Sequence, residues 1–185
     1  AALYQVWGRP QAGLSALDEA QRREAAVEVR MPLRLELLIQ AQAWEQASRA
    51  AQLYLASHPQ NSNALRVLTL AQIHQRRCDQ AANTATHWHT AAPEDPDAQR
   101  AWWALNREGA PPATVCKNDP LLCAQWSAGF AIEPFQVGLW LVRESEWALA
   151  ACVLADADPS AEVHAWLGEA LSRLGETVQA RRHLE

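Results

Sequence analysis

The chain has 185 residues and a mass of 20.5 kDa, and its apolar content of 49% is enough for a core and excludes a disordered chain. The 16 basic and 21 acidic side chains give a net charge of −5, so there is no positive excess for binding nucleic acid. No apolar run approaches the roughly 18 residues of a membrane span, and we expect no membrane insertion. Because the chain begins at Ala1 and a helical pattern still runs at Arg182, we expect it to be a piece of a larger protein.

Residues 1–27 are predicted to form an N-terminal segment with a capping helix. Asp18 and Gln21 have the spacing of a capping box, which predicts a helix that begins at Asp18. Pro32 follows and predicts a kink or interruption at the entry to the next helix.

A repeat appears when the chain is compared with itself at an offset of 34 residues. Each aligned segment contains two amphipathic runs separated by a short polar turn, which predicts two antiparallel helices. An unrelated alanine-rich helix bundle is the alternative. The aligned pairs are Met31 and Leu65, Trp44 and Cys78, Ala47 and Ala81, Ala51 and Ala85, Tyr54 and Trp88, and Pro59 and Pro93.

The repeats are predicted to form one array over residues 28–185. In the third unit, Gly109 and the prolines that follow it break the chain, and Asp119-Pro120 restarts a helix that ends at Gly129. This unit is therefore expected to carry an insertion, residues 110–119, as an exposed loop. The predicted units are 28–61, 62–95, 96–130, 131–160 and a truncated 161–185.

The last unit resembles the tetratricopeptide repeat family, because Leu167-Gly168, Gly175 and Ala180 follow that family's Leu-Gly, Gly and Ala spacing. The earlier units match through Trp44, Ala47, Pro59, Ala81 and Pro93, and depart at Leu35 and Thr69, where the family has glycine. The resemblance implies an all-α solenoid, a right-handed stack of about four antiparallel helix hairpins plus an N-terminal helix. It also implies that the first helices line a concave surface that holds a partner.

First-helix positions i, i+4, i+7 and i+8 form one stripe along this surface. The stripe is rich in arginine with apolar residues between, which favours an extended peptide with carboxylates and apolar side chains. The alternative is that these are solvated faces. The candidate groove residues are Glu36, Gln40, Arg66, Leu70, His74, Arg100, Arg107, Arg143, Trp166, Glu169 and Arg173.

The four cysteines divide into two pairs by context. Cys116 and Cys123 flank a turn and are candidates for a disulfide that closes a small loop. Cys78 and Cys152 lie in apolar helical contexts two repeats apart, where we expect small core residues and no bridge. An oxidised Cys116–Cys123 pair would favour an extracytoplasmic compartment over the cytoplasm.

Neither a metal site nor a catalytic site is expected. His87 and His89 are two positions apart on a helix and point in different directions, so they cannot easily share an ion. No helix carries His-Glu-x-x-His and no turn carries Gly-x-Ser-x-Gly. We therefore expect no cofactor and no enzymatic activity.

Nine tryptophans are numerous for this length. Trp44, Trp88 and Trp147 occupy packing positions, and one of the adjacent Trp102 and Trp103 should be more exposed than the other.

The function predicted from the sequence is a scaffold that binds a protein or peptide. One alternative is an extracytoplasmic domain of a membrane-anchored envelope or glycan-assembly protein. Another is an accessory domain of an enzyme, with an exposed tryptophan that contacts carbohydrate. The sequence leaves the partner and the oligomeric state open.

Overall fold

The computed structural model describes residues 8–22, 27–107, 109–129 and 131–184. Within these ranges there are twelve helices and no strand, which confirms the predicted all-α class. No described helix combines the length and the apolarity needed to cross a bilayer. The chain divides into two compact units, residues 1–92 and 93–185, which we call the N-terminal and the C-terminal unit and describe separately.

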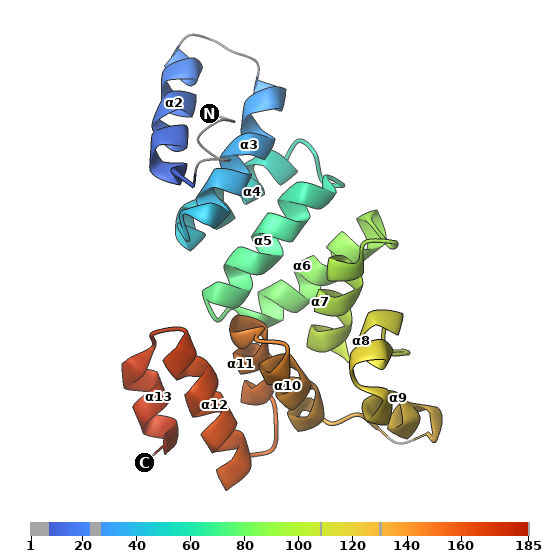
Figure 1. Cartoon of the computed structure of the whole chain (residues 1–185). Helices are drawn as coiled ribbons and strands as arrows, with labels where there is room; N and C mark the ends of the chain where they lie inside the picture. The colour runs from blue at the N-terminus through green and yellow to red at the C-terminus, as the bar shows by residue number, and fades with distance from the viewer. Residues whose placement is uncertain (1–7, 23–26, 108, 130, 185) are drawn as a thin grey trace. The chain divides into compact units, whose positions relative to one another are not determined.

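The N-terminal unit is a row of helices in which each packs on the next (Figure 1). Helix α3 also contacts α5, so the first helices of two successive hairpins are neighbours, as in a helical solenoid. The helices are α2 (Pro10–Arg22), α3 (Val27–Gln40), α4 (Trp44–Leu55), α5 (Ser62–His74) and α6 (Cys78–Ala91).

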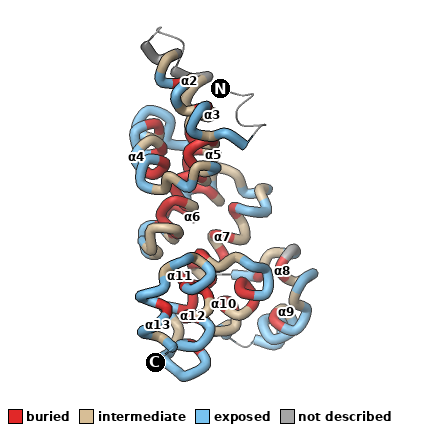
Figure 2. Tube along the Cα trace, turned by 60° about the vertical axis from the view of Figure 1, so that its left-hand side comes forward, coloured by how far each residue is buried: buried red, intermediate tan, exposed pale blue. Residues whose placement is uncertain are grey.

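Small side chains set the spacing of these helices. Ala47 and Ala51 on α4, with Ala64 and Ala71 on α5, are fully buried in one core cluster that Leu35 and Leu38 of α3 complete. Figure 2 shows the buried segments of α4, α5 and α6. Because alanine carries only a methyl group, it lets two helix backbones approach closely. The repeated alanines seen in the sequence therefore mark the helix contacts.

The C-terminal unit contains two regular hairpins and a less regular segment that precedes them. Helices α10 to α13 pack in succession, and α10 also contacts α12, again bringing successive first helices together. Helix α7 packs on α11 and on α8. The helices are α7 (Pro96–Asn106), α8 (Ala113–Asn118), α9 (Pro120–Ser127), α10 (Pro134–Arg143), α11 (Trp147–Ala155), α12 (Ala161–Arg173) and α13 (Thr177–Leu184).

One turn geometry joins the two helices of every regular hairpin. The residue two positions before the second helix has a positive φ, and the following N–H bonds back to the carbonyl five residues earlier. This is the Schellman motif, in which glycine is the favoured left-handed residue. The left-handed residues are Gln42 (φ 53°), Arg76 (φ 58°), Ser145 (φ 63°) and Gly175 (φ 79°).

First helices begin differently, with a side-chain cap. Asn61 accepts from the N–H of Ala64, and Ser160 accepts from the N–H of Val163. Glu133 and Gln136 form a capping box at the start of α10. A left-handed turn therefore joins the two helices within a hairpin. A side-chain cap begins the next hairpin.

Two glycines provide close contacts within the C-terminal hairpins. A Cβ at Gly138 would lie 2.5 Å from Cγ of Leu154, and one at Gly168 would lie 2.7 Å from Cγ of Leu184. Each glycine lies on a first helix and faces the second helix of its own hairpin. Leu35 and Thr69, which replace glycine in the N-terminal unit, are both fully buried.

The N-terminal prediction was wrong in its details. Asp18 does not begin a helix, because it lies inside α2, which begins at Pro10. Its carboxylate forms an ion pair with Arg34 at 2.6 Å instead of capping. Pro32 lies inside α3 and does not end it. Proline at the sixth position of a helix removes an N–H that would bond to a carbonyl in the first turn.

The predicted loop at 110–119 was also wrong. Residues Ala113–Asn118 form helix α8, and Val115 is fully buried. The helix before it ends two residues earlier than expected, with Arg107 left-handed at its end (φ 56°), although Gly109 is left-handed too (φ 69°). The prediction at the other end is confirmed, because Asp119 caps α9 and Gly129 follows it with φ 83°.

Candidate functional site

The groove candidates of the N-terminal unit include an ion pair between two first helices. Arg66 on α5 donates to the carboxylate of Glu36 on α3 and to the side chain of Asn63. The contact joins successive hairpins. Glu36 also neutralises the positive charge of Arg66, which was predicted to bind a carboxylate of the ligand.

A ring stack occupies the end of the same stripe. His74, the last residue of α5, stacks on Trp44, the first residue of α4, with ring centroids 3.8 Å apart and planes 4° apart. Gln40 is exposed and Leu70 is half-buried. Three of the five candidates in this unit therefore hold the unit together through contacts of their own.

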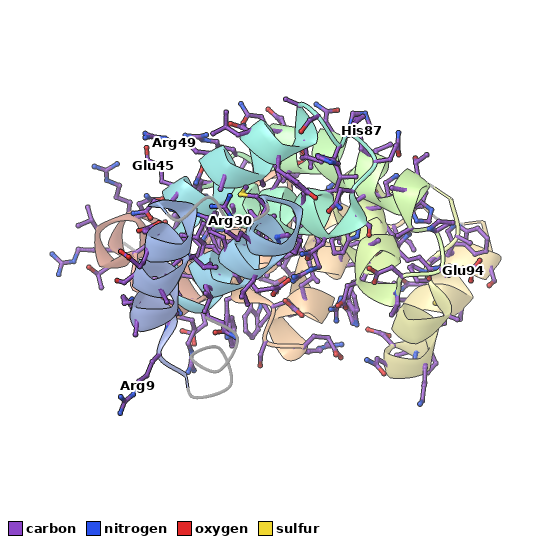
Figure 3. The ribbon with its side chains drawn as sticks, turned by 90° about the horizontal axis from the view of Figure 1, so that it is seen from above. Arg9, Arg30, Glu45, Arg49, His87 and Glu94 are labelled. Atoms are coloured by element: carbon purple, nitrogen blue, oxygen red, sulfur yellow. A yellow bond between two sulfur atoms is a disulfide. The ribbon has the colours of Figure 1, made fainter. Side chains whose placement is uncertain are left out.

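One charged pair outside the stripe, on α4, points into solvent. Figure 3 shows Glu45 and Arg49 together on the outer side of α4, and their side chains form an ion pair at 2.6 Å. Both are more than two-thirds exposed, so the pair lies on a solvated face.

The predicted groove arginines of the C-terminal unit all have acidic partners within that unit. A ligand carboxylate would therefore have to compete with carboxylates already in place. The pairs are Arg100 with Asp97 (2.6 Å) and Glu146 (3.5 Å), Arg107 with Asp156 (3.3 Å), Arg143 with Asp119 (3.4 Å), and Arg173 with Glu169 (2.7 Å).

Helix α12 presents the remaining candidates. Arg173 lies over the ring of Trp147 at 5.4 Å as well as beside Glu169. Trp166 is 37% exposed. The packing prediction for tryptophans holds fully for Trp88, which is 1% exposed, whereas Trp44 and Trp147 are half-buried.

A disulfide crosslinks α8 to α9, and side-chain hydrogen bonds connect this segment to α10 and the residue after it. A disulfide joins Cys116 to Cys123, which confirms the predicted pair. Asn118 donates to the carboxylate of Glu144 at 3.1 Å, and Gln136 donates to Gln125 at 3.0 Å. These contacts restrict the movement of a short segment that has little core of its own.

Two hollows lie beside this segment, and a tryptophan lines each. The first has a volume of about 310 Å³, the second about 380 Å³, and we call the second the tryptophan hollow. Trp140 of the first and Trp103 of the second pack edge to face, with centroids 6.0 Å apart. The first is lined by Pro96, Asp97, Arg100, Lys117, Asn118, Trp140 and Glu144, and the tryptophan hollow by Trp103, Arg107, Gly109, Trp126, Gly129, Ala131 and Ile132.

Large apolar side chains are exposed on α9 next to the tryptophan hollow. Leu121 is 77% exposed and Trp126 is 42% exposed, whereas Leu122 is buried. In contrast, Trp103 is 1% exposed and Trp102 is half-buried, as the adjacent positions predicted. The hollow thus combines a buried, fixed ring with a partly exposed one.

Sequence reasoning missed Lys117 because it treated 110–119 as a loop outside the repeat. It missed Trp126 and Ile132 because it looked for binding residues only along the first-helix stripe. A usable signal was present in α9 itself. Cys123 and Trp126 are three positions apart on one short helix, so the disulfide also restrains the backbone that carries the tryptophan.

The prediction for the other cysteines was wrong. Cys78 and Cys152 are both disulfide-bonded, and no cysteine of the chain is free. Apolar surroundings are compatible with either a buried thiol or a half-cystine, so context alone did not distinguish them.

Comparisons with known proteins give distant structural likeness and no match in sequence. No family model matches the chain, and no curated protein matches it. A solved structure described as MamA MSR-1 C2 is similar, with 13% identity and a TM-score of 0.38, over 98% of this chain and 93% of that one. The assignment of a helix-hairpin repeat therefore depends on the helix order and the shared turns described above.

Proposed function

We propose that this chain is a non-enzymatic binding module that holds a segment of a partner protein. We further propose that the tryptophan hollow receives an apolar side chain of that segment. The observation that carries the proposal is Trp126, a partly exposed ring lining a hollow of about 380 Å³ whose other ring, Trp103, is buried.

The physical basis is the role of tryptophan at protein interfaces. Tryptophan is enriched among the few residues that dominate binding free energy, and such residues lie in well-packed pockets. The Cys116–Cys123 disulfide and the ties to α10 hold α9 in place before binding. A preformed surface lowers the ordering cost of association.

Arg107 also lines the hollow, and it donates from Nη2 to Asp156. Its Nη1 is shielded from solvent, so a bound segment does not reach that atom in this structure. The segment chemistry we propose is therefore a large apolar side chain, which the rings contact.

The proposal is tested by peptide selection against the intact chain. Peptides enriched from a random display library are measured by titration against the parent and against Trp126→Ala. We expect most of them to carry an aromatic or large aliphatic anchor and to lose at least about tenfold in affinity.

Leu53→Ala provides a matched control, because Leu53 is another large exposed apolar residue, 76% exposed, in the N-terminal unit. It should leave peptide affinity unchanged. If Trp126→Ala binds the selected peptides as tightly as the parent while Leu53→Ala does not, the site lies elsewhere. Helical circular dichroism and the unfolding midpoint check that both variants fold.

A second proposal concerns the compartment and follows from the cysteines. All four are disulfide-bonded. Disulfides persist in oxidising compartments and are rare in the cytoplasm. This supports the view that the chain belongs to an extracytoplasmic domain.

Alkylation in freshly lysed source cells tests the compartment. We expect no alkylated cysteine before reduction and four after it, read by mass spectrometry of the intact chain. Four alkylated thiols in the unreduced sample would place the chain in a reducing compartment.

A further inference from the structure

Two histidines on different helices face each other in the last hairpin. His164 is in the first turn of α12 and His183 is in the last turn of α13, and their Nδ1 atoms are 3.0 Å apart. The ring centroids are 5.3 Å apart with planes 29° from parallel. Because the two helices are antiparallel, the start of one lies beside the end of the other.

The contact between the helices explains why the rings meet. Gly168 lies one turn after His164 on α12, and a Cβ there would be 2.7 Å from Cγ of Leu184, the neighbour of His183. The missing side chain lets the end of α13 come close to α12. The histidine pair thus depends on a backbone approach that the fold already requires.

We propose that His164 and His183 bind one divalent transition-metal ion through their Nδ1 atoms. Without metal, one Nδ1–H donates to the unprotonated Nδ1 of the other ring, and the ion takes the place of that shared proton. Metal–imidazole bonds are about 2.0–2.1 Å long, so an ion bound to two nitrogens 3.0 Å apart lies off the line that joins them. Both rings must tilt for their lone pairs to point at the ion, and His164 at least is exposed and able to turn.

The distance also indicates which ions fit. Two such bonds to nitrogens at this spacing meet at nearly a right angle, which is the angle between neighbouring ligands in tetragonal and square-planar complexes. Cu²⁺ and Ni²⁺ prefer those geometries, whereas Zn²⁺ prefers the wider tetrahedral angle. We therefore expect Cu²⁺ or Ni²⁺ to bind here more tightly than Zn²⁺.

The surroundings leave room for the remaining ligands. His164 is exposed and His183 is half-buried, so water can reach the ion. Among the described residues no cluster of three or more His, Cys, Asp or Glu could hold a metal. Of the described residues, His164 and His183 supply the ligands here, and water completes the coordination.

The experiment titrates the untagged chain at neutral pH with NiCl₂, and separately with CuSO₄, by calorimetry and visible absorption. We expect saturable binding of one ion per chain at this site. His164→Gln and His183→Gln should each lower the affinity at least tenfold, because each removes one of two ligands. His58→Gln and His87→Gln, at exposed histidines elsewhere, should leave it unchanged.

Thermal unfolding provides the second measurement. An ion that bridges α12 and α13 binds only the folded hairpin, so saturating NiCl₂ should raise the unfolding midpoint of the parent but not of either variant. Each variant reports its own midpoint without metal, so loss of folding is recognised directly. Equal nickel affinity in the parent and in His164→Gln would overturn the proposal, as would ZnCl₂ binding more tightly than both Cu²⁺ and Ni²⁺.

Discussion

Ser145 and Gly175 adopt the same left-handed backbone conformation at the same position of two successive hairpin turns, with φ of 63° and 79°. In both turns the next N–H closes a bond of 2.9 Å to the carbonyl five residues earlier. A side chain at this φ costs roughly 1–2 kcal/mol, and glycine avoids that cost. The turn geometry is thus shared while only one hairpin has the favoured residue.

Replacing the strained serine should stabilise the chain. Ser145 is exposed and its side chain makes no hydrogen bond, so Ser145→Gly removes strain without removing a contact. Glycine loses more backbone entropy on folding, which offsets part of the gain. We expect the free energy of unfolding to rise by about 0.5–1 kcal/mol in urea titrations.

Gly175→Ala makes the opposite change, because it removes glycine from the equivalent left-handed position of the next turn. A Cβ there meets no atom within 4 Å, so any loss comes from the backbone alone. Its free energy of unfolding should fall by about 1 kcal/mol. A gain in Gly175→Ala together with a loss in Ser145→Gly would contradict this account of the turns.

The two packed glycines should respond differently to alanine. In Gly138→Ala the new Cβ meets Leu154, which is fully buried and has no space to move. In Gly168→Ala it meets Leu184, which is 60% exposed and can swing away. Allowing for alanine's better helix propensity, we expect a loss of about 1–2 kcal/mol for the first and a change within about 1 kcal/mol for the second.

Denaturant unfolding of both variants under one set of conditions checks this difference. The comparison is controlled internally, because the same substitution is made on the same face of two first helices. Equal losses would mean that exposure of the facing leucine does not decide the cost.

The sequence predicted the parts of the fold that recur. Second helices begin at Trp44 and Cys78, and first helices at Ser62 and Pro96, so both recur at the 34-residue offset found by self-comparison. Alanine repeats at the helix contacts carried that signal, because burial constrains side-chain size strongly. Side chains of similar size that recur at equivalent positions can be recognised by comparing the sequence with itself.

The features that the sequence did not reveal are turns with unfavoured residue types and contacts between residues far apart in the chain. Gln42 and Arg76 take left-handed turns although neither residue type favours them, since tertiary packing of the hairpin overrides local preference. The ion pair of Arg66 with Glu36 joins residues 30 apart, and no local pattern indicates it. The acidic partners of Arg107 and Arg143 are likewise distant in sequence. Those of Arg100 and Arg173 lie three and four positions earlier on the same helix, so these two pairs could have been found from the sequence.

The Cys116–Cys123 disulfide should stabilise its own segment more than the rest of the unit. Cysteines seven residues apart close a small loop, for which the chain-entropy estimate is about 2–3 kcal/mol. In a variant with Cys116→Ser and Cys123→Ser, amide exchange in α8 and α9 should accelerate by about tenfold or more. Hydrogen-exchange mass spectrometry measures this segment by segment.

Helices α12 and α13 are the internal control for that experiment. They do not contain these cysteines, and their exchange should remain within a factor of about two of the parent. Faster exchange in α12 and α13 to the same extent would mean that the disulfide supports the whole C-terminal unit rather than one segment.

The pair of Arg66 and Glu36 should contribute through its geometry between two hairpins rather than through charge alone. The side chains are 26% and 31% exposed, so the attraction is less screened than at a fully exposed pair. A double-mutant cycle of Arg66→Met and Glu36→Gln should give a coupling free energy of about 1 kcal/mol.

Charge reversal tests the same pair. Arg66→Glu should destabilise the chain more than Arg66→Met, because it places two carboxylates together. Adding Glu36→Arg should recover most of that loss. Arg49→Met, which breaks an exposed pair on α4, should cost less than about 0.5 kcal/mol. Coupling near zero in 0.1 M salt would show that the contact lends no net stability.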